Sequence, residues 1–528
     1  MDRDFLLRGI KDGFHIVDEG AVPIAAEMGN YTSATSAKRV LVEKQIQKEI
    51  AEGRYVTTHD KPILISALGA IDKPDGSVRI ITDCSQPQAA GALNEHATLP
   101  WTLKYQTIDD AVNAIKQHNN PYVAKLDLKS AYRSVKIHES NHKFTGLKWK
   151  FQGDSSFTYF YDSALCFGSK LAPGIFHRLT QAIRRMMQRR GFEVIVYLDD
   201  FLLISPDKEH CKRGLNTLMS LVRELGFAIA YEKLIPPTQY ITFLGLIIDI
   251  NEMCLRLPAD KIVNIRAVLL TFKQRKRASL QQLQSLAGKL AFCSRVVQGG
   301  RIYVQRILEL MRTLRHKRHK ARLTTDFHAD IQWWLTYINS NNFKPYARFF
   351  TRMFRIETDA CNHAGAAILC GHDWLYMNWA RDIPPVANMH INVKETMAAM
   401  MAVFRWAPVL QDSRVVIYTD NICTKATINK GTCRNTFLMP FLRHLCSLSS
   451  LYNFQVICNY LPGVENIFAD CASRLSKKGN FLFWLSMLSS GVKYTLLDAI
   501  ALCHGHMSND VLIDLFKQMK QQIAWWPG

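Results

Sequence analysis

The stretch VIVYLDDFLLIS (residues 194–205) decides the fold, because it places Asp199 and Asp200 between two apolar, β-rich runs. Two adjacent acids in such a setting are costly, since a buried carboxylate needs a partner of opposite charge. A strand-turn-strand hairpin would hold both acids at its tip, where divalent metals would supply that charge. A second β-rich run, YVAKLDL (residues 122–128), ends near Asp127 and would lie beside the hairpin. Three acids converging from two strands predict a two-metal site with Mg²⁺ bound through oxygen ligands.

The neighbouring sequence predicts an α+β arrangement around this hairpin. The runs ILISALGAI and SVRIITDC flank the turn residues of KPDG and predict a hairpin between residues 62 and 84. Helical spacing of apolar residues predicts helices over 38–51, 173–190 and 210–225.

The charge balance indicates a polyanionic partner. Lys and Arg number 66 against 45 Asp and Glu, a net charge of +21, so nucleic acid is the first expectation and an acidic membrane the second. Two basic runs, KQRKR (273–277) and RTLRHKRHKAR (312–322), lie in a region of helical pattern. A solvated helix face is the alternative, but the almost wholly positive charge favours contact with backbone phosphates.

The cellular setting follows from what the composition lacks. No apolar run reaches the ~20 residues that a membrane-spanning helix needs, and the start, MDRDFLLRGIKDGF, is too charged for a signal peptide. The 13 cysteines are scattered without a C-x-x-C pair, which fits reduced thiols. We therefore expect an intracellular protein, nuclear or cytoplasmic, with no membrane partner.

Strand signals return in a new order from residue 354 to residue 473 and predict a separate α/β domain. It has an acid set of its own, in RIETDA, VKETMAA, VVIYTDN and LPGVENIFADCASR: Asp359, Glu395, Asp420 and Asp470. These acids come from separate predicted elements, so only a multivalent cation would hold them together. Four structural acids are the alternative reading.

Six blocks of the chain resemble the motifs of reverse transcriptases, in family order. YLDD resembles their motif C, LDLKSAYRSVKI motif A, LCFGSKLAPGIFHRL motif B and LGFAIAYEKL motif D. YITFLGLIID resembles their primer-grip hairpin and DKPDGSVRIITDCS their fingers hairpin, while the second acid set resembles ribonuclease H. The blocks LLRGIKDGF, EIAEGRYV and ISALGAIDKPDGSVRIITDCS are most similar to DIRS-type (tyrosine-recombinase) retrotransposons, related to gypsy-type and retroviral polymerases.

The resemblance implies an α+β right-hand polymerase (fingers, palm, thumb) followed by an α/β ribonuclease H-like domain. It divides the chain into an N-terminal extension (1–50), fingers and palm (51–250), a helical thumb and linker (251–350), a ribonuclease H domain (351–475) and a C-terminal tail (476–528).

The resemblance also assigns roles to individual residues. Catalytic and metal-binding roles, with Mg²⁺ and Mn²⁺ as an alternative, fall on Asp127, Asp199, Asp200, Asp359, Glu395, Asp420 and Asp470. Substrate-binding roles fall on Lys73, Arg79, Ser130, Ala131, Tyr132, Phe167, Gly168 and Lys233. Of these, Lys73 and Arg79 would hold the triphosphate, and Tyr132 would lie under the sugar. The chain departs from the pattern at Phe167, where retroviruses have glutamine, and at Tyr460, where a histidine is frequent.

The function that the resemblance implies is an RNA-directed DNA polymerase with ribonuclease H, of a retrotransposon. Its partners would be an RNA template, a DNA primer, an RNA/DNA hybrid and dNTPs. One rival is a domesticated, non-catalytic nucleic-acid-binding scaffold with the polymerase fold, against which the seven costly acids argue. Another is a replicative RNA polymerase, which would usually carry GDD and a polar residue where Tyr132 stands.

Overall fold

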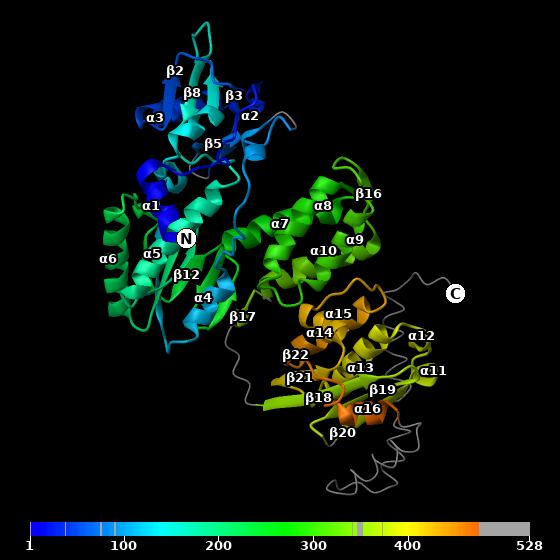
Figure 1. The fold of residues 1–528 in the computed structure, drawn as a ribbon. Coiled ribbons are helices and arrows are strands. Elements are labelled where there is room, and N and C mark those ends of the chain that lie inside the picture. Colours follow the sequence, from blue (N-terminus) through cyan, green and yellow to red (C-terminus); the bar gives the residue numbers. More distant parts are fainter. Residues whose placement is uncertain are drawn as a thin grey trace, which may run out of the picture. The chain divides into compact units, whose positions relative to one another are not determined.

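The structure is a computed structural model that describes residues 2–36, 38–73, 76–88, 91–340, 342–345, 352–371 and 373–474. It divides into two compact units, Met1–Met253 and Cys254–Gly528 (Figure 1). The predicted tail over 476–528 lies outside the described residues. None of the helices in the described ranges combines the length and apolarity that a membrane crossing requires.

The acid-bearing hairpin belongs to a four-stranded antiparallel sheet of the first unit, called here the central sheet. Its order is β11-β6-β10-β9, with bounds Ile235–Thr238, Tyr122–Asp127, Asp200–Ser205 and Glu193–Tyr197. β10 pairs with β9 on one side and with β6 on the other. The predicted hairpin is therefore confirmed, and the strand that carries Asp127 is its direct neighbour.

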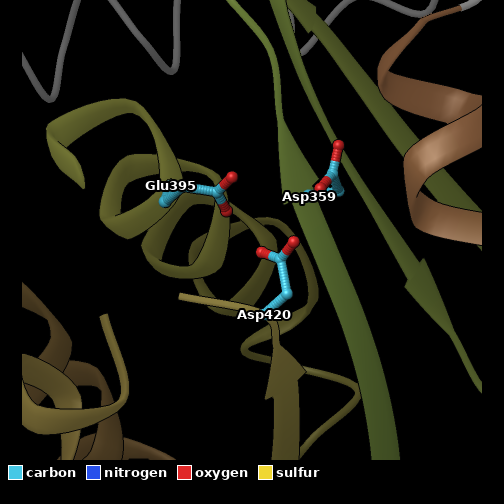
Figure 2. A group of neighbouring side chains, drawn as sticks. All are labelled: Asp359, Glu395 and Asp420. Carbon is cyan, nitrogen blue, oxygen red and sulfur yellow. The ribbon is translucent and has the colours of Figure 1, made fainter. Parts of the chain in front are cut away.

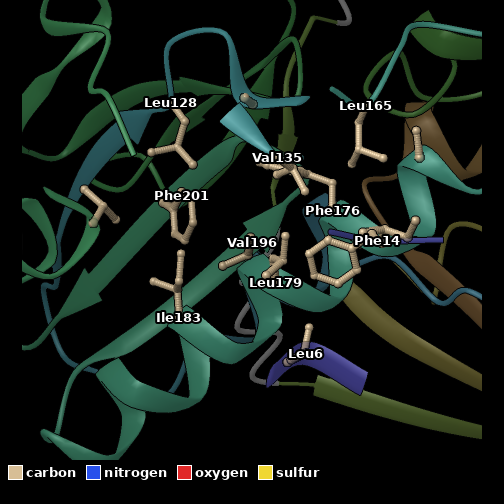
Figure 3. Close-up of a cluster of buried hydrophobic side chains, with 14 of the residues drawn as sticks. Leu6, Phe14, Leu128, Val135, Leu165, Phe176, Leu179, Ile183, Val196 and Phe201 are labelled. Carbon is tan, nitrogen blue, oxygen red and sulfur yellow. The ribbon is translucent and has the colours of Figure 1, made fainter. Parts of the chain in front are cut away.

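Two helices cover the central sheet, α5 (Ala172–Arg189) and α6 (Lys208–Glu224). Phe176, Leu179 and Ile183 recur at helical spacing on α5, so they share one face and are buried. They meet Val196 and Phe201 of the sheet in one apolar core (Figure 3). The acidic hairpin is therefore supported by continuous apolar strands that are buried between helices, and by the apolar face that the 3.6-residue period gives to α5.

A second sheet, called the outer sheet, has the order β1-β3-β7-β8-β2. Its strands are Ala26–Glu27, Leu64–Ile65, Gly146–Trp149, Thr158–Asp162 and Tyr55–Thr58. β4 (Ala67–Asp72) and β5 (Val78–Asp83) form a separate antiparallel hairpin, which confirms the prediction for this part of the chain. The preceding residues of the same apolar run, in β3, pair with β1 and β7 of the outer sheet instead.

The first 50 residues contribute to both cores of this unit. Leu6 of α1 (Asp2–Asp12) and Phe14 belong to the core of the central sheet. Val42 and Ile46 of α3 (Arg39–Ala51) belong to the core of the outer sheet. The remaining elements of the unit are α2 (Thr32–Thr35), η1 (Leu93–His96), α4 (Ile108–Ile115), η2 (Ala131–Ser134), η3 (Glu139–Phe144), η4 (Tyr231–Lys233), β12 (Tyr240–Phe243) and β13 (Leu246–Asp249).

The second unit begins with helices, as the helical pattern around the basic runs predicts, and with short strands between them. The helices are α7 (Ala259–Gln274), α8 (Leu280–Cys293), α9 (Gln305–Arg312) and α10 (Thr325–Ser340), with η5 (Ile302–Val304) before α9. The strands are β14 (Cys254–Arg256), β15 (Arg277–Ser279), β16 (Lys320–Arg322) and β17 (Lys344–Pro345). The two basic runs therefore end in strands, where the sequence pattern indicates helix.

A five-stranded mixed sheet follows, in the order β20-β19-β18-β21-β22. Its strands are Asp373–Asn378, Ala364–Leu369, Arg352–Ala360, Ser413–Thr419 and Gln455–Tyr460. β18, β19 and β20 are antiparallel neighbours, whereas β21 lies parallel to β18 and β22 parallel to β21. Helices separate β20 from β21 and β21 from β22, so this part of the chain has the predicted α/β character.

The helices of this part pack a core around α13 (Ile391–Trp406), whose Met397, Met400 and Met401 are fully buried. The methionines are core residues. The other helices are α11 (Trp379–Asp382), α12 (Pro384–Ala387), α14 (Ile422–Lys430), α15 (Met439–Leu451) and α16 (Ile467–Ser473).

A buried carboxylate joins two helices that precede residue 345 in the chain, α9 and α10, to α15, which follows the mixed sheet's first strands. Asp330 of α10 is only 1 % exposed. Arg443 of α15 donates to its Oδ1 at 2.8 Å and to its Oδ2 at 3.1 Å, and Arg306 of α9 donates to Oδ1 at 3.0 Å. A carboxylate at this depth is costly without its cations, so the three helices are held together by one charge cluster.

Replacing Arg443 by Met should lower the free energy of unfolding by about 3–5 kcal/mol, because Asp330 keeps a single cation in an apolar setting. Arg306→Met should cost less, since the Arg306 side chain is 25 % exposed and water replaces part of its role. Denaturant unfolding of the full chain measures both. Equal stability of wild type and Arg443→Met would mean that Asp330 does not depend on this pair.

Candidate active sites and nucleic-acid interface

The first acid set stands where β6 ends and β10 begins. Asp200 lies opposite Asp127 in the ladder and opposite Tyr197 across the hairpin turn. Leu198 in that turn has a φ of 53°, a left-handed conformation that is strained for a leucine. The backbone N–H of Leu128 donates to the carbonyl of Asp199 at 3.2 Å. The strained turn and this hydrogen bond bring the backbones of Asp127, Asp199 and Asp200 together at one end of the two inner strands.

The electrostatics of this edge call for a cation. Asp127 is 6 % exposed, and its Oδ1 has no hydrogen-bond partner among the described residues. Burial and the carboxylates of Asp200 and Asp199 raise the pKa of Asp127, and burial is the first cause that raises the pKa of Asp199. An orphaned, buried carboxylate oxygen beside two further acids fits the oxygen ligand set of Mg²⁺.

Two lysines contact these acids. Lys233 in η4 donates from Nζ to Asp127 Oδ2 at 3.2 Å, although its side chain is 59 % exposed. Lys125 on β6 holds its Nζ 2.8 Å from Asp200 Oδ1. Sequence reasoning missed Lys125, but it stands two residues before Asp127 and therefore on the same face of the strand.

The predicted nucleotide-binding residues gather beside the acids. Ser130 has a φ of 52°, and this left-handed residue turns the chain from β6 into η2, which carries Ala131 and Tyr132. The ring of Tyr132 lies 5.3 Å from that of Phe167, centroid to centroid. The guanidinium of Arg79 lies over the Phe167 ring, 5.2 Å from the ring centroid. Phe167 therefore joins the predicted sugar contact to a predicted phosphate contact.

Gly168 connects this cluster to the β4–β5 hairpin, whose turn begins at Lys73. Gly168 has a φ of +130°, and a Cβ there would lie 1.9 Å from the carbonyl oxygen of Thr82, so only glycine fits. The amide of Thr82 in turn donates to the carbonyl of Phe167 at 3.0 Å. Lys73 begins the hairpin turn, where its N–H donates to Ser77 O at 2.8 Å.

Three members of the second acid set come together in the mixed sheet. Ligand oxygens of Asp359 on β18, Glu395 on α13 and Asp420 after β21 all lie within 4.8 Å of one another. Figure 2 shows Glu395 reaching from its helix toward the strand of Asp359, with Asp420 below. Glu395 Oε1 accepts from the N–H of Ala360 at 3.1 Å, while its Oε2 has no partner among the described residues.

Burial and mutual repulsion of these carboxylates raise their pKa values. Burial and then the carboxylates of Asp359 and Asp420 raise the pKa of Glu395 to about 9. Burial raises the pKa of Asp359 to about 6, against a hydrogen bond from Ser473 that lowers it. Three acids that cannot all ionise together, with an oxygen left unpaired, fit a divalent cation by donor chemistry.

Asp470, the fourth predicted acid, lies on α16 outside this 4.8 Å group and pairs with Arg474 at 2.6 Å. α16 is tied to β18 at both ends. Asn466 donates from Nδ2 to the carbonyl of Thr358 at 2.9 Å, and Ser473 donates from Oγ to Asp359 Oδ2 at 2.5 Å. Sequence reasoning missed Ser473 and Arg474, which follow Asp470 at helical spacing and so share its side of α16.

The two basic runs form one surface in the second unit, the basic sheet. β15 and β16 pair with Arg277 opposite Arg322 and Ser279 opposite Lys320. Like charges directly opposite each other destabilise a sheet, so an anionic partner would stabilise this pairing. The exposed basic residues of the strands and of the loop before β16 are Arg277, Arg315, Lys317, Arg318, Lys320 and Arg322.

Residues 71–248 match the family model described as reverse transcriptase (RNA-dependent DNA polymerase). This segment carries the first acid set and the predicted nucleotide-binding residues. The chain is 24% identical over 377 residues to the enzymatic polyprotein of figwort mosaic virus, covering 66% of this chain and 50% of that protein. It is 28% identical over 170 residues to Protein P of duck hepatitis B virus (strain Germany/DHBV-3), covering 32% of this chain and 20% of that protein. The chain spans about half the length of the enzymatic polyproteins of figwort mosaic virus and carnation etched ring virus.

The fold is similar to that of the foamy viral protease-reverse transcriptase. A structure of that protein in complex with double-stranded DNA matches 85% of this chain and 73% of its own, with a TM-score of 0.54 and 15% sequence identity. Another, in complex with an RNA/DNA hybrid, matches 86% of this chain and 57% of its own, with a TM-score of 0.52 and 14% identity. The chain therefore has a retroviral reverse transcriptase-like fold.

The raised pKa of Glu395 predicts how metal-free protein responds to pH. A folded acid with a pKa near 9 keeps its proton while the unfolded acid has lost it, so stability falls as pH rises from about 4.5 to about 9. In EDTA the melting temperature should fall by a few °C over that window, and less in Glu395→Gln. Mg²⁺ at pH 8 should restore more stability to wild type than to the variant. Superimposable pH profiles of the two proteins would contradict the assignment.

Neutralising Arg315, Lys317, Arg318 and Lys320 to Gln should flatten the dependence of nucleic-acid affinity on salt. Each lost phosphate contact should reduce the slope of log affinity against log salt by about 0.9 on duplex DNA. The matched control changes four exposed lysines of the first unit to Gln, with the same loss of charge: Lys44, Lys48, Lys208 and Lys212. The prediction is wrong if both variants keep the wild-type slope or flatten it equally.

Proposed function

We propose that the protein is an RNA-directed DNA polymerase that copies template RNA into DNA. The observation that carries this proposal is the pairing of Asp127 with Asp200 at the end of β6 and β10, inside the segment that matches the reverse transcriptase model. Divalent cations held by Asp127, Asp199 and Asp200 would bind the attacking 3′-hydroxyl and the leaving pyrophosphate.

The residues around the acids have the chemistry to bind and orient a nucleotide. Arg79 and Lys73 would hold the triphosphate by charge, and the N–H groups of Ser130 and Ala131 would donate to its oxygens. The Tyr132 ring would lie under the sugar and exclude a 2′-hydroxyl by clash. Lys233, within 3.2 Å of Asp127, is a candidate proton donor to the leaving pyrophosphate.

Phe167 and Gly168 would act on the nucleotide by packing. Phe167 offers an apolar ring where a polar contact would otherwise stand, between Tyr132 and Arg79. Gly168 permits the backbone after Phe167 to approach Thr82 of the β4–β5 hairpin closely.

We propose a second activity, ribonuclease H, for the mixed sheet of the second unit. The grouping of Asp359, Glu395 and Asp420 within 4.8 Å, with Asp470 on the adjoining helix, supports metal-assisted hydrolysis of RNA in an RNA/DNA hybrid. The sheet order, with antiparallel strands at one edge and parallel strands at the other, supports a ribonuclease H-like domain.

We also propose that the chain comes from a retrotransposon of the DIRS type and works inside the cell. The blocks LLRGIKDGF and EIAEGRYV support this origin. RNA template, DNA primer, RNA/DNA hybrid and dNTPs would be its partners, as for polymerases of the same fold. A non-catalytic scaffold is disfavoured, because orphaned carboxylate oxygens at two separate sites are costly and bring a scaffold no benefit.

Asp199→Asn and Asp420→Asn should separate the two activities, because the acids stand in different folding units. Asp199→Asn should reduce primer extension on RNA and DNA templates by at least about 10³-fold through loss of a charged metal ligand, and leave hybrid cleavage intact. Asp420→Asn should do the reverse. Primer extension and cleavage of a labelled hybrid, with Mg²⁺ and with EDTA, measure both.

Each variant serves as the other's control for folding and purity. Near wild-type extension by Asp199→Asn would refute the polymerase site, and near wild-type cleavage by Asp420→Asn would refute the ribonuclease H site. Loss of both activities in a variant that melts like wild type would mean that the two activities share a site.

A further inference from the structure

Arg133 directly follows Tyr132 in the short helix η2, but its side chain leaves in another direction. Tyr132 packs against Phe167 and, edge to face at 5.1 Å between centroids, against Phe176 of α5. Arg133 is 8 % exposed at its side chain and lies among acids of the outer sheet and α3. η2 is therefore fixed by aromatic rings on one side and by a charge cluster on the other.

The charge cluster uses all three nitrogens of the Arg133 side chain. Its Nε and Nη2 donate to Glu49 Oε2 at 3.1 and 2.9 Å, and its Nη1 donates to Asp162 Oδ2 at 2.7 Å. Nη1 also lies 3.2 Å from the carbonyl oxygen of Leu165, close to Phe167 in the chain. Arg54 pairs with the same Glu49 oxygen at 2.6 Å.

Stability alone does not account for this arrangement. Glu49 is 6 % exposed and Asp162 is 2 % exposed, and buried ion pairs are on average no more stabilising than apolar residues of the same volume. What a guanidinium adds is direction, because its planar fork bonds several acceptors in one fixed geometry. The acceptors of Arg133 lie on α3 (Glu49), on β8 (Asp162) and in the segment that leads to Phe167 (Leu165). The guanidinium itself belongs to the residue that follows Tyr132.

We infer that Arg133 is a positioning residue for sugar selection: through Glu49 and Asp162 it fixes η2, and thereby the height of the Tyr132 ring under the incoming nucleotide. The inference rests on the proposed polymerase function. Discrimination by clash is sensitive to position, since a ring displaced by a fraction of an ångström leaves room for a 2′-hydroxyl.

The test compares Arg133→Lys with Arg54→Lys. Both substitutions replace a guanidinium beside Glu49 by a point charge that cannot make the fork, but only Arg133 belongs to η2. The readout is the ratio of kcat/KM for a deoxyribonucleotide to that for the matching ribonucleotide, with melting temperature measured in parallel. We expect Arg133→Lys to lower the ratio by about tenfold, and Arg54→Lys to leave it within about twofold of wild type.

A double-mutant cycle with Tyr132→Ala shows whether Arg133 acts through the ring. If it does, Arg133→Lys should not change the ratio further once Tyr132 is Ala. Asp162→Asn, which weakens the same fork without changing η2, should lower the ratio as well and replaces Arg133→Lys if that variant does not fold.

Three results would overturn the inference. The first is an equal effect of Arg133→Lys and Arg54→Lys, which would make the cluster a matter of general stability. The second is an undiminished effect of Arg133→Lys in the Tyr132→Ala background. The third is a wild-type chain that does not extend primers. This result would refute the proposed polymerase function itself, and it differs from the first two because it needs no variant.

Discussion

Repulsion between carboxylates that the fold brings close together is the constraint on which both acid sets depend. Asp127 and Asp200 are paired at the end of β6 and β10, and Asp359, Glu395 and Asp420 gather between β18 and α13. The energy for this comes from the apolar cores beneath, where α5 packs on the central sheet and α13 on the mixed sheet. Packing of these cores thus keeps the carboxylates close to one another, although their mutual repulsion would otherwise separate them.

The two regions solve this problem with different supports. Asp127 and Asp200 lie opposite each other on adjacent strands, so the hydrogen-bond ladder sets their spacing, while Asp199 is placed by the hairpin turn. Lysines at positions 125 and 233 offset part of the charge. The acids of the mixed sheet come from a strand, a helix and a loop, so their spacing depends on tertiary packing and on the bonds that tie α16 to β18. The second site is therefore the more sensitive of the two to distant changes in the core.

Local patterns in the sequence predicted most of the fold. The hairpin over 194–205 follows from two apolar, β-rich runs around the acids, and it is confirmed. The α/β character of residues 354–473 follows from the return of strand signals and is confirmed as well. The pairing of the two basic runs as strands was not predicted, because their charges carry no period and the partner is more than 40 residues away in the chain. Arg133, Glu49 and Asp162 were missed for the same reason: a buried ion cluster looks like ordinary surface charge until the fold brings it together. The roles of the site residues remain predictions.

The Asp330 cluster limits where recombination can join the coding sequences of two related chains without disrupting the fold. Residue 302 and helices α9 and α10 share a core or a charge cluster with α15, so the body that contains the mixed sheet begins well before its first strand. A recombination event with its crossover at residue 350 would separate Asp330 from Arg443 and leave a buried charge in each half. Crossovers before residue 302 keep the pair together, so inheritance of the second acid site should follow the inheritance of α9 and α10.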